Sequence, residues 1–212
     1  MSATAQARTS PRRRPRTRRR VGRRRLALLA TVVLATIIAT AVLSPWADKA
    51  VKEVTLPLRH DDVIRQQAAD KQLDPALIAG VIYVESRFRD QTSHAGAKGL
   101  MQLMPQTADY IATKSGGTEF EQGDLADPQI NISYGSWYLR YLQEKYHGNV
   151  LLTLAAYNAG EGKVDEWWRE AADRGEHFRA ADIPFAETRE YVARVQEAKR
   201  AYRREYAREL GL

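Results

Sequence analysis

The chain contains no cysteine, which excludes disulfide bonds and thiolate chemistry. Its four histidines, at positions 60, 94, 147 and 177, show none of the short spacings typical of metal ligands. The sequence also lacks the glycine-rich loops that bind nucleotide phosphates and the serine elbow of hydrolases. We therefore expect neither a metal nor an organic cofactor.

Runs of alternating apolar and polar residues, the pattern of a half-buried strand, are absent after residue 60. Apolar residues in this part recur at helical spacing, and prolines and glycines divide it into segments. The pattern predicts an all-α domain with helices at 60–71, 75–88, 105–114, 128–146, 149–158, 162–173 and 186–209. Two intervening loops, 90–104 and 115–126, are long enough to carry function.

Acidic residues are absent from residues 1–25, which hold 11 arginines. The formal charge of +7 belongs to this tail, because the remainder carries 22 basic and 26 acidic side chains. The next segment, Leu26 to Leu43, has 18 residues without a charge, which is within the ~17–25 residues of a membrane-spanning helix. By the positive-inside rule, the arginines place the amino terminus in the cytoplasm.

We accordingly expect a basic cytoplasmic tail at 1–25, a transmembrane signal anchor at 26–46, a linker at 47–59 and an extracytoplasmic domain at 60–212. Such a protein crosses the cell membrane once. Secretion after cleavage of a signal peptide is the alternative, since Ala39-Thr40-Ala41 resembles a cleavage site. Arginine runs can also bind nucleic acid, but the apolar segment that follows favours a role in topology, so no nucleic-acid partner is expected.

Glu85 follows a run, residues 76–84, that is apolar except for the phenol of Tyr83. The dipeptide Asp74-Pro75 before this run is typical of a helix start. A helix that is apolar on all faces is buried, so we expect Glu85 at the wall of the core. Burial raises the pKa of a carboxyl group, which suits a general acid that works near neutral pH.

Three further segments stand out for their glycine, aromatic, amide or carboxylate residues. They are Gly-Leu-Met-Gln at 99–102, Ala-Tyr-Asn-Ala-Gly at 156–160 and Glu-Thr-x-x-Tyr-Val at 187–192. The small residues of the loop around the first segment allow a ligand to approach the backbone closely. Asn131 and Gly135 lie within a predicted long helix, where a glycine indicates close contact with another helix.

Together with Glu-Ser at 85–86, these segments, in this order and spacing, resemble the catalytic domain of lytic transglycosylases of the soluble (SLT) type, which is related in fold to goose-type lysozyme. The resemblance covers residues 60–205 and implies an all-α, lysozyme-like domain. It also implies cleavage of the β-1,4 bond between N-acetylmuramic acid and N-acetylglucosamine in peptidoglycan. Similar enzymes add no water: the muramic C6 hydroxyl attacks C1 and leaves a 1,6-anhydro end.

The resemblance implies that Glu85 is a single general acid and base, whereas glycoside hydrolases normally use two carboxylates. Ser86 would orient its neighbours. Contacts with the substrate are implied for Ser93, Met101, Gln102, Met104, Tyr157, Asn158, Glu187 and Tyr191. Some have a plain structural alternative, since Asn158 can end a helix, Glu187 can complement a helix dipole and Tyr191 can fill the core.

Other functions stay open at this point. A hydrolytic muramidase of the same fold would admit water to the site, and a non-catalytic peptidoglycan-binding module would act as a scaffold. A membrane-tethered helical interaction protein is a further alternative, which the loop at 93–105 disfavours. The expected partners are peptidoglycan glycan strands, the membrane through residues 26–46, and the machinery of cell-wall synthesis or division.

Overall fold

The computed structural model describes residues 29, 31–34, 36, 40, 46, 47, 49–117 and 119–212. The chain divides into two compact units, Met1–Val51 and Lys52–Leu212. None of the helices in the described residues is long and apolar enough to cross a membrane. Most of the predicted tail and anchor, residues 1–46, lies outside the described residues.

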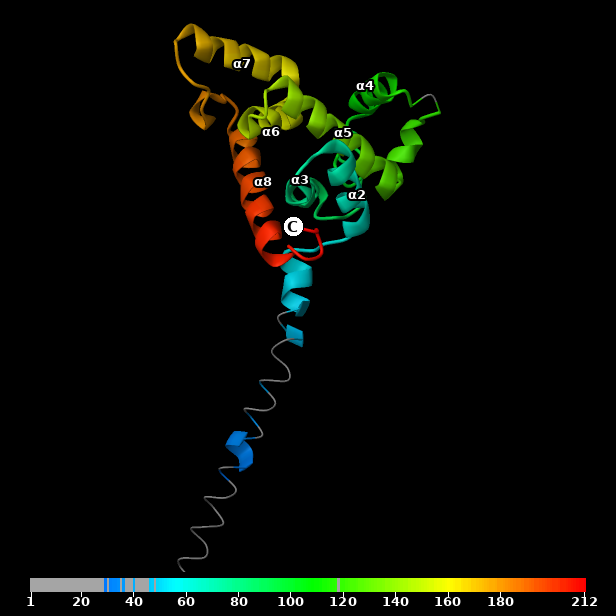
Figure 1. Ribbon diagram of the computed structural model, residues 1–212, viewed down its shortest axis with the longest axis vertical. Helices are drawn as coiled ribbons and strands as arrows, with labels where there is room; N and C mark the ends of the chain where they lie inside the picture. Colours follow the sequence, from blue (N-terminus) through cyan, green and yellow to red (C-terminus); the bar gives the residue numbers. More distant parts are fainter. Residues whose placement is uncertain are drawn as a thin grey trace, which may run out of the picture. The chain divides into compact units, whose positions relative to one another are not determined.

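The second unit is built from helices, and its described residues contain no β-strand beyond isolated bridges. Figure 1 shows α2 (Asp61–Lys71), α3 (Pro75–Ser86), α4 (Pro105–Ser115), η1 (Gln122–Ala126), α5 (Pro128–Lys145), α6 (Val150–Ala159), α7 (Glu161–Asp173), η2 (Ala180–Asp182) and α8 (Ala186–Glu205). All the α-helices predicted from the sequence between residues 60 and 209 are present. The largest difference is at the end of α8, which was expected at residue 209 and lies at Glu205.

Two of the helices begin with an aspartate that caps them and a proline in the first turn. The Asp74 carboxylate accepts a hydrogen bond of 2.9 Å from the backbone N–H of Ala76 at the start of α3. The Asp127 carboxylate accepts hydrogen bonds of 2.7 and 3.2 Å from the N–H groups of Gln129 and Ile130 at the start of α5. These bonds satisfy donors that a helix end leaves free, so the Asp-Pro pairs set the helix boundaries locally.

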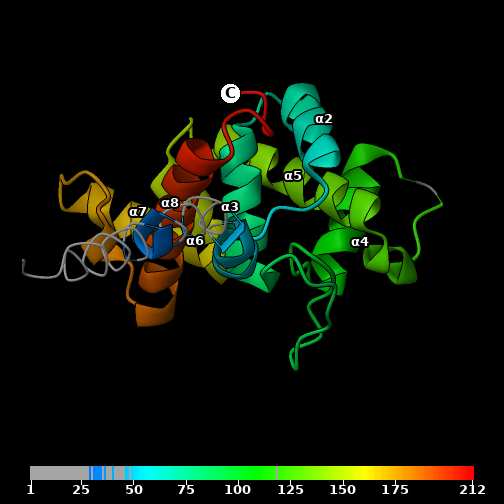
Figure 2. The same ribbon diagram turned by 90° about the horizontal axis from the view of Figure 1, so that it is seen from below.

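Helix α3 forms the centre of the core, and every residue from 76 to 82 is buried. Helix α8 packs along it, as Figures 1 and 2 both show. The close approach is at Gly80, where an added Cβ would lie 3.0 Å from the backbone nitrogen of Lys199 and 3.2 Å from the carbonyl oxygen of Val195. Gly80 therefore sets the spacing of α3 and α8, the two helices that meet at the candidate site.

The end of the expected linker belongs to the second unit. Tyrosine hydroxyls from α3 and from the end of α8 donate hydrogen bonds to three successive carbonyl oxygens: Tyr83 to Thr55 (2.9 Å), Tyr206 to Leu56 (2.7 Å) and Tyr202 to Pro57. Residues 55–57 are thus fixed on the domain. Residues 49–55 are helical, and the second unit begins at Lys52, within the predicted linker at 47–59.

Candidate active site

Glu85 lies in the last turn of α3, partly buried where α3 meets α8. The Tyr191 hydroxyl of α8 donates a hydrogen bond of 2.7 Å to Glu85 Oε1, and the charge of Arg194, one turn further along α8, also acts on this carboxylate. Burial is the largest influence and raises the pKa of Glu85 to about 7, although Tyr191 and Arg194 both act to lower it. A carboxyl group with this pKa can donate and accept protons near neutral pH.

The charges that act on Glu85 include no second carboxylate within the part of the chain that the structure describes. Its neighbours are the phenols of Tyr157 and Tyr191. Burial is the main cause that raises the pKa of both phenols well above the ordinary value, and the charge of Glu85 is the second. Both phenols therefore stay neutral. In the same described residues, no cluster of acidic and histidine side chains could hold a metal ion. The site presents one titratable carboxyl group between neutral hydroxyls.

The Gly-Leu-Met-Gln segment is held in place by the buried side chain of Asn131 in α5. Asn131 Oδ1 accepts a hydrogen bond of 2.8 Å from the backbone N–H of Met101. Its Nδ2 donates hydrogen bonds of 3.0 Å to the carbonyl oxygens of Lys98 and Leu125. Because Asn131 has no exposed surface, water does not compete for these bonds. One side chain therefore fixes the conformation of the loop.

Two more hydroxyls join this loop to the helices of the core. The buried Ser86 hydroxyl, next to Glu85, donates a hydrogen bond of 2.7 Å to the carbonyl oxygen of Leu100. The Tyr157 hydroxyl of α6 donates one of 2.9 Å to the carbonyl oxygen of Met101. Residues of α3, α5 and α6 thus converge on adjacent peptide groups. The orienting role of Ser86 stays a prediction.

Glycines make the close packing around the loop possible. Gly99 has a φ of +74°, and an added Cβ would lie 2.1 Å from Asn131 Nδ2. At Gly135 of α5, an added Cβ would lie 2.4 Å from Met101 Sδ. The expectation that Gly135 marks a contact between two helices is therefore wrong, because this glycine accommodates a side chain of the loop. The Met101 side chain is fully buried, and its contact with a substrate stays a prediction.

Ser93 and Gln102 make hydrogen bonds within the loop itself. The Ser93 hydroxyl accepts a hydrogen bond of 3.0 Å from the N–H of Ala97. Gln102, which has a φ of +47°, donates from Nε2 to the carbonyl oxygens of Gln91 (2.9 Å) and Gly99 (2.8 Å). Both residues stabilise the loop, and their contact with a substrate stays a prediction.

The remaining predicted residues differ in exposure. Asn158 is exposed at the end of α6, and its Oδ1 accepts a hydrogen bond of 2.8 Å from the buried Thr188 hydroxyl of α8. Glu187 and Met104 are also exposed, and Met104 retains 42% of its accessible surface. Tyr191 is buried, which agrees with core packing, and its hydroxyl is bound to Glu85. Its contact with a substrate stays a prediction.

Arg194 was not predicted from the sequence, and Asn131 was singled out there without a role in the site. Arg194 follows Tyr191 by three residues, so the two lie on neighbouring positions of one helix face. Asn131 is a polar residue within the buried face of α5. The signal for Arg194 was its helical spacing from Tyr191. The signal for Asn131 was a polar residue that interrupts an apolar helix face.

We expect a Glu85→Gln variant to be more stable than the wild type above neutral pH. Folding raises the pKa of Glu85 from an ordinary 4.5 to about 7, so the native state disfavours the charged form. This cost is absent below about pH 4.5 and complete above about pH 7. The free energy of unfolding of the variant should therefore exceed that of the wild type by about 2–3 kcal/mol at about pH 8, and this difference should vanish as the pH falls from about 7 to about 4.5.

Urea unfolding of both proteins at several pH values measures this difference. Glu170→Gln, an exposed control on α7, should show no such trend, and equal trends in both variants would contradict the prediction.

Comparisons with known proteins agree with this geometry. The model of the transglycosylase SLT domain family matches residues 62–178. The soluble lytic murein transglycosylase of Escherichia coli (strain K12) is 34% identical over 146 residues, which are 68% of this chain and 23% of that protein. The membrane-bound lytic murein transglycosylase C of Glaesserella parasuis serovar 5 is 30% identical over 167 residues, which cover 68% of this chain and 46% of that protein.

Solved structures give the same result. The 70-kDa soluble lytic transglycosylase from Escherichia coli has a TM-score of 0.66 at 33% identity, and the match covers 72% of this chain and 25% of that one. The complex of the 70-kDa soluble lytic transglycosylase with bulgecin A has a TM-score of 0.67 at 31% identity, with 85% of this chain and 29% of that one covered. The chain therefore spans about a quarter of the length of the soluble relatives. These matches confirm the all-helical, lysozyme-like fold. Because the family model covers more than half of its residues, the chain belongs to the transglycosylase SLT domain family.

Proposed function

We propose that the protein is a peptidoglycan lytic transglycosylase with Glu85 as its single general acid and base. The observation that carries this proposal is the partly buried Glu85 carboxyl, whose pKa of about 7 and hydrogen bond from Tyr191 prepare it for proton transfer. The relatives named lytic murein transglycosylases support the substrate class.

In the proposed reaction, protonated Glu85 donates its proton to the glycosidic oxygen while the bond from that oxygen to C1 of the N-acetylmuramic residue breaks. The resulting carboxylate then accepts the proton of the C6 hydroxyl as the C6 oxygen bonds to C1. Glu85 ends in its initial protonated form, and no water is consumed. Tyr191 and Arg194 stabilise the carboxylate between the two steps, since both favour its charged form.

The predicted substrate contacts surround this carboxyl group in the proposal. Met104 at the start of α4 and Asn158 at the end of α6 offer exposed surface to a substrate. Tyr157 supports the loop backbone and is only partly buried. The exposed Glu187 carboxylate at the start of α8 is available for hydrogen bonds with sugar hydroxyls.

We also propose that residues 26–46 anchor the protein in the cell membrane, with the catalytic domain outside. The support is the uncharged segment directly after 11 arginines, together with a relative named as membrane-bound. After expression in a bacterium, the full-length protein should stay in the membrane fraction after alkaline carbonate extraction. Release of a shortened chain would instead identify a cleaved signal peptide.

Analysis of the products tests the reaction. The full-length wild-type protein is incubated with peptidoglycan sacculi, and the released muropeptides are analysed by mass spectrometry without chemical reduction. A transglycosylase gives 1,6-anhydro ends about 18 Da lighter than reducing ends, because no water is added to the cleaved bond. Reducing ends would assign a muramidase, and binding to sacculi without release would assign a scaffold module.

Replacement of Tyr191 by Phe should shift the pH dependence of this activity. The Tyr191 hydroxyl lowers the pKa of Glu85, so its loss raises that pKa above the wild-type value of about 7. Because the general acid must be protonated, the activity should persist to higher pH in the variant. Profiles of kcat/KM against pH measure the shift.

The control is Tyr206→Phe, which loses a hydroxyl bound to the Leu56 carbonyl and should keep the wild-type profile. The role of Tyr191 would be disproved if the fall in activity at high pH occurred at the same pH in Tyr191→Phe and in the wild type.

A further inference from the structure

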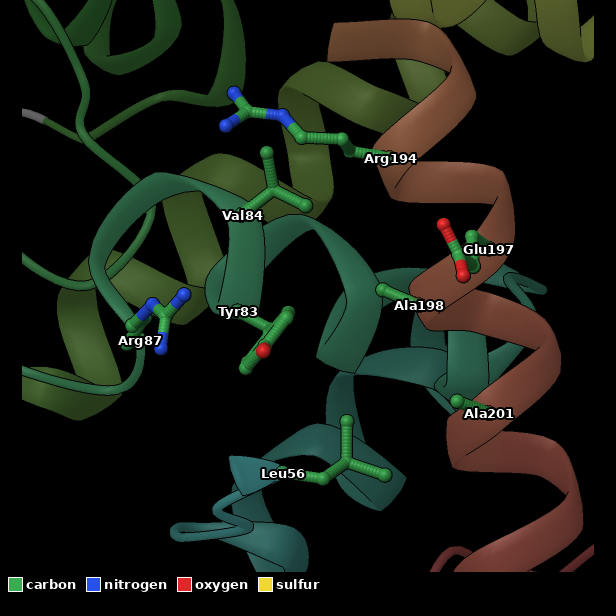
Figure 3. A pocket seen from close by; sticks show the side chains of 8 residues that line it. All are labelled: Leu56, Tyr83, Val84, Arg87, Arg194, Glu197, Ala198 and Ala201. Atoms are coloured by element: carbon green, nitrogen blue, oxygen red, sulfur yellow. The ribbon is translucent and has the colours of Figure 1, made fainter. Parts of the chain in front are cut away.

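A cavity of about 320 Å³ lies between α3 and α8, next to the candidate active site (Figure 3). Its lining residues are Leu56, Tyr83, Val84, Arg87, Arg194, Glu197, Ala198 and Ala201. Val84 directly precedes Glu85 in α3, and the charge of Arg194 acts on the Glu85 carboxylate. The cavity therefore borders the reaction centre, and part of its wall is the fixed end of the linker, through Leu56.

The cavity carries charges of both signs on exposed side chains. No ion pair within the described residues involves Arg87, Arg194 or Glu197. Figure 3 shows the two arginine side chains on either side of Val84, with Glu197 on α8. The rest of the wall is mainly apolar. Such a surface complements a short chain that bears both a carboxylate and an amino group.

The backbone at Arg87 gives a second, independent indication. Arg87 ends α3 with φ 52° and ψ 40°, and Phe88 follows with φ 59°. Two successive residues other than glycine in this region are unusual, and strained backbone concentrates at functional sites. The turn leaves the Arg87 guanidinium 5.4 Å from the centre of the Tyr83 ring, and both side chains line the cavity.

We propose that this cavity binds the free end of a peptide attached to the muramic residue, with its carboxylate at Arg87 and Arg194 and its amino group at Glu197. The inference rests on the proposed function, because peptidoglycan stem peptides carry such carboxylates and, on their diamino acid, such an amino group. Arginine pairs with carboxylates through two parallel hydrogen bonds, which suits this assignment. The cavity thus gives the enzyme a preference for strands that retain their peptides.

The test compares two substrates of the full-length protein, namely glycan strands with stem peptides and the same strands stripped of them by an amidase. The variant is Arg87→Gly, because glycine adopts a positive φ without strain and the change removes only the side chain. The ratio of kcat/KM for peptide-bearing strands to that for stripped strands should fall about tenfold, as expected for a lost charged hydrogen bond. Arg200→Ala, which removes the same charge from α8 outside the cavity, should keep the wild-type ratio.

A binding measurement separates this inference from the proposed reaction. A synthetic stem tetrapeptide with a diamino acid in third position is titrated by calorimetry into full-length Glu85→Gln protein. Binding should be about tenfold weaker when Arg87→Gly is added. An unchanged substrate ratio, or equal tetrapeptide affinity with and without Arg87, would overturn the inference. If the wild type cleaves neither substrate, the proposed function fails, and the tetrapeptide titration alone decides the role of the cavity.

Discussion

The Glu85→Gln variant should release anhydro-muropeptides about 10³–10⁴ times more slowly than the wild type, near the upper end of what proton transfer contributes. Glutamine keeps the size of the side chain but can neither donate the proton to the leaving oxygen nor accept one from the C6 hydroxyl. The loss is large because one residue serves both steps in the proposed reaction. Within the described residues, no other carboxylate acts on this position and could replace it.

Release of soluble products from sacculi, followed by chromatography, measures this loss. Glu170→Gln is the matched control, since it makes the same chemical change on the exposed face of α7, outside the site. Its rate should equal that of the wild type. If Glu85→Gln kept more than about one tenth of the wild-type rate, the loss would be smaller than the ~10²-fold minimum expected when a general acid is removed. That result would assign the role of general acid to another group.

Replacement of Asn131 by Ala should lower the free energy of unfolding by about 3–5 kcal/mol, a large part of the ~5–15 kcal/mol of a typical domain. The change leaves the Met101 N–H and the Leu125 carbonyl without their Asn131 partner at a buried position. The Lys98 carbonyl loses one of its two hydrogen bonds and keeps the one from the Leu103 N–H. The loop with the Gly-Leu-Met-Gln segment would lose its fixed conformation, so activity should fall together with stability.

Urea unfolding of Asn131→Ala and of Asn149→Ala tests this prediction. Asn149 also accepts two backbone hydrogen bonds, of 3.0 and 3.3 Å, but it does so at the exposed start of α6. Loss of such a helix cap costs about 1 kcal/mol. The prediction fails if the two variants are destabilised equally, because burial would then add nothing to the role of Asn131.

Much of the helical fold could be predicted because its boundaries depend on local features. The Asp-Pro pairs at the starts of α3 and α5 form their capping bonds within three residues, so neighbouring sequence suffices to identify them. The end of α8 was placed too late because residues 206–209 continue its charged, helix-forming composition. A pattern of that kind does not show where the chain turns.

The candidate site was predictable only in part. The position of Glu85 at the end of an apolar helix indicated a buried acid without any knowledge of the fold. Its hydrogen bond with Tyr191 joins residues 106 positions apart, and only the family resemblance suggested that they meet. The contact between Gly135 and Met101 and the three bonds of Asn131 depend on how the loop packs on α5. Nothing in the local sequence specifies that arrangement.

The three tyrosine hydroxyls that fix residues 55–57 limit how far the folded unit can lie from a membrane anchor. If residues 26–46 are the anchor we propose, only residues 47–51 separate it from the folded unit that begins at Lys52. Residues 49–51 are helical, and even a fully extended connection, at about 3.6 Å per residue, would be no longer than about 20 Å. The active site could then contact only the innermost layer of the wall, where new glycan leaves the membrane. Older layers further out would lie too far from the membrane to reach it.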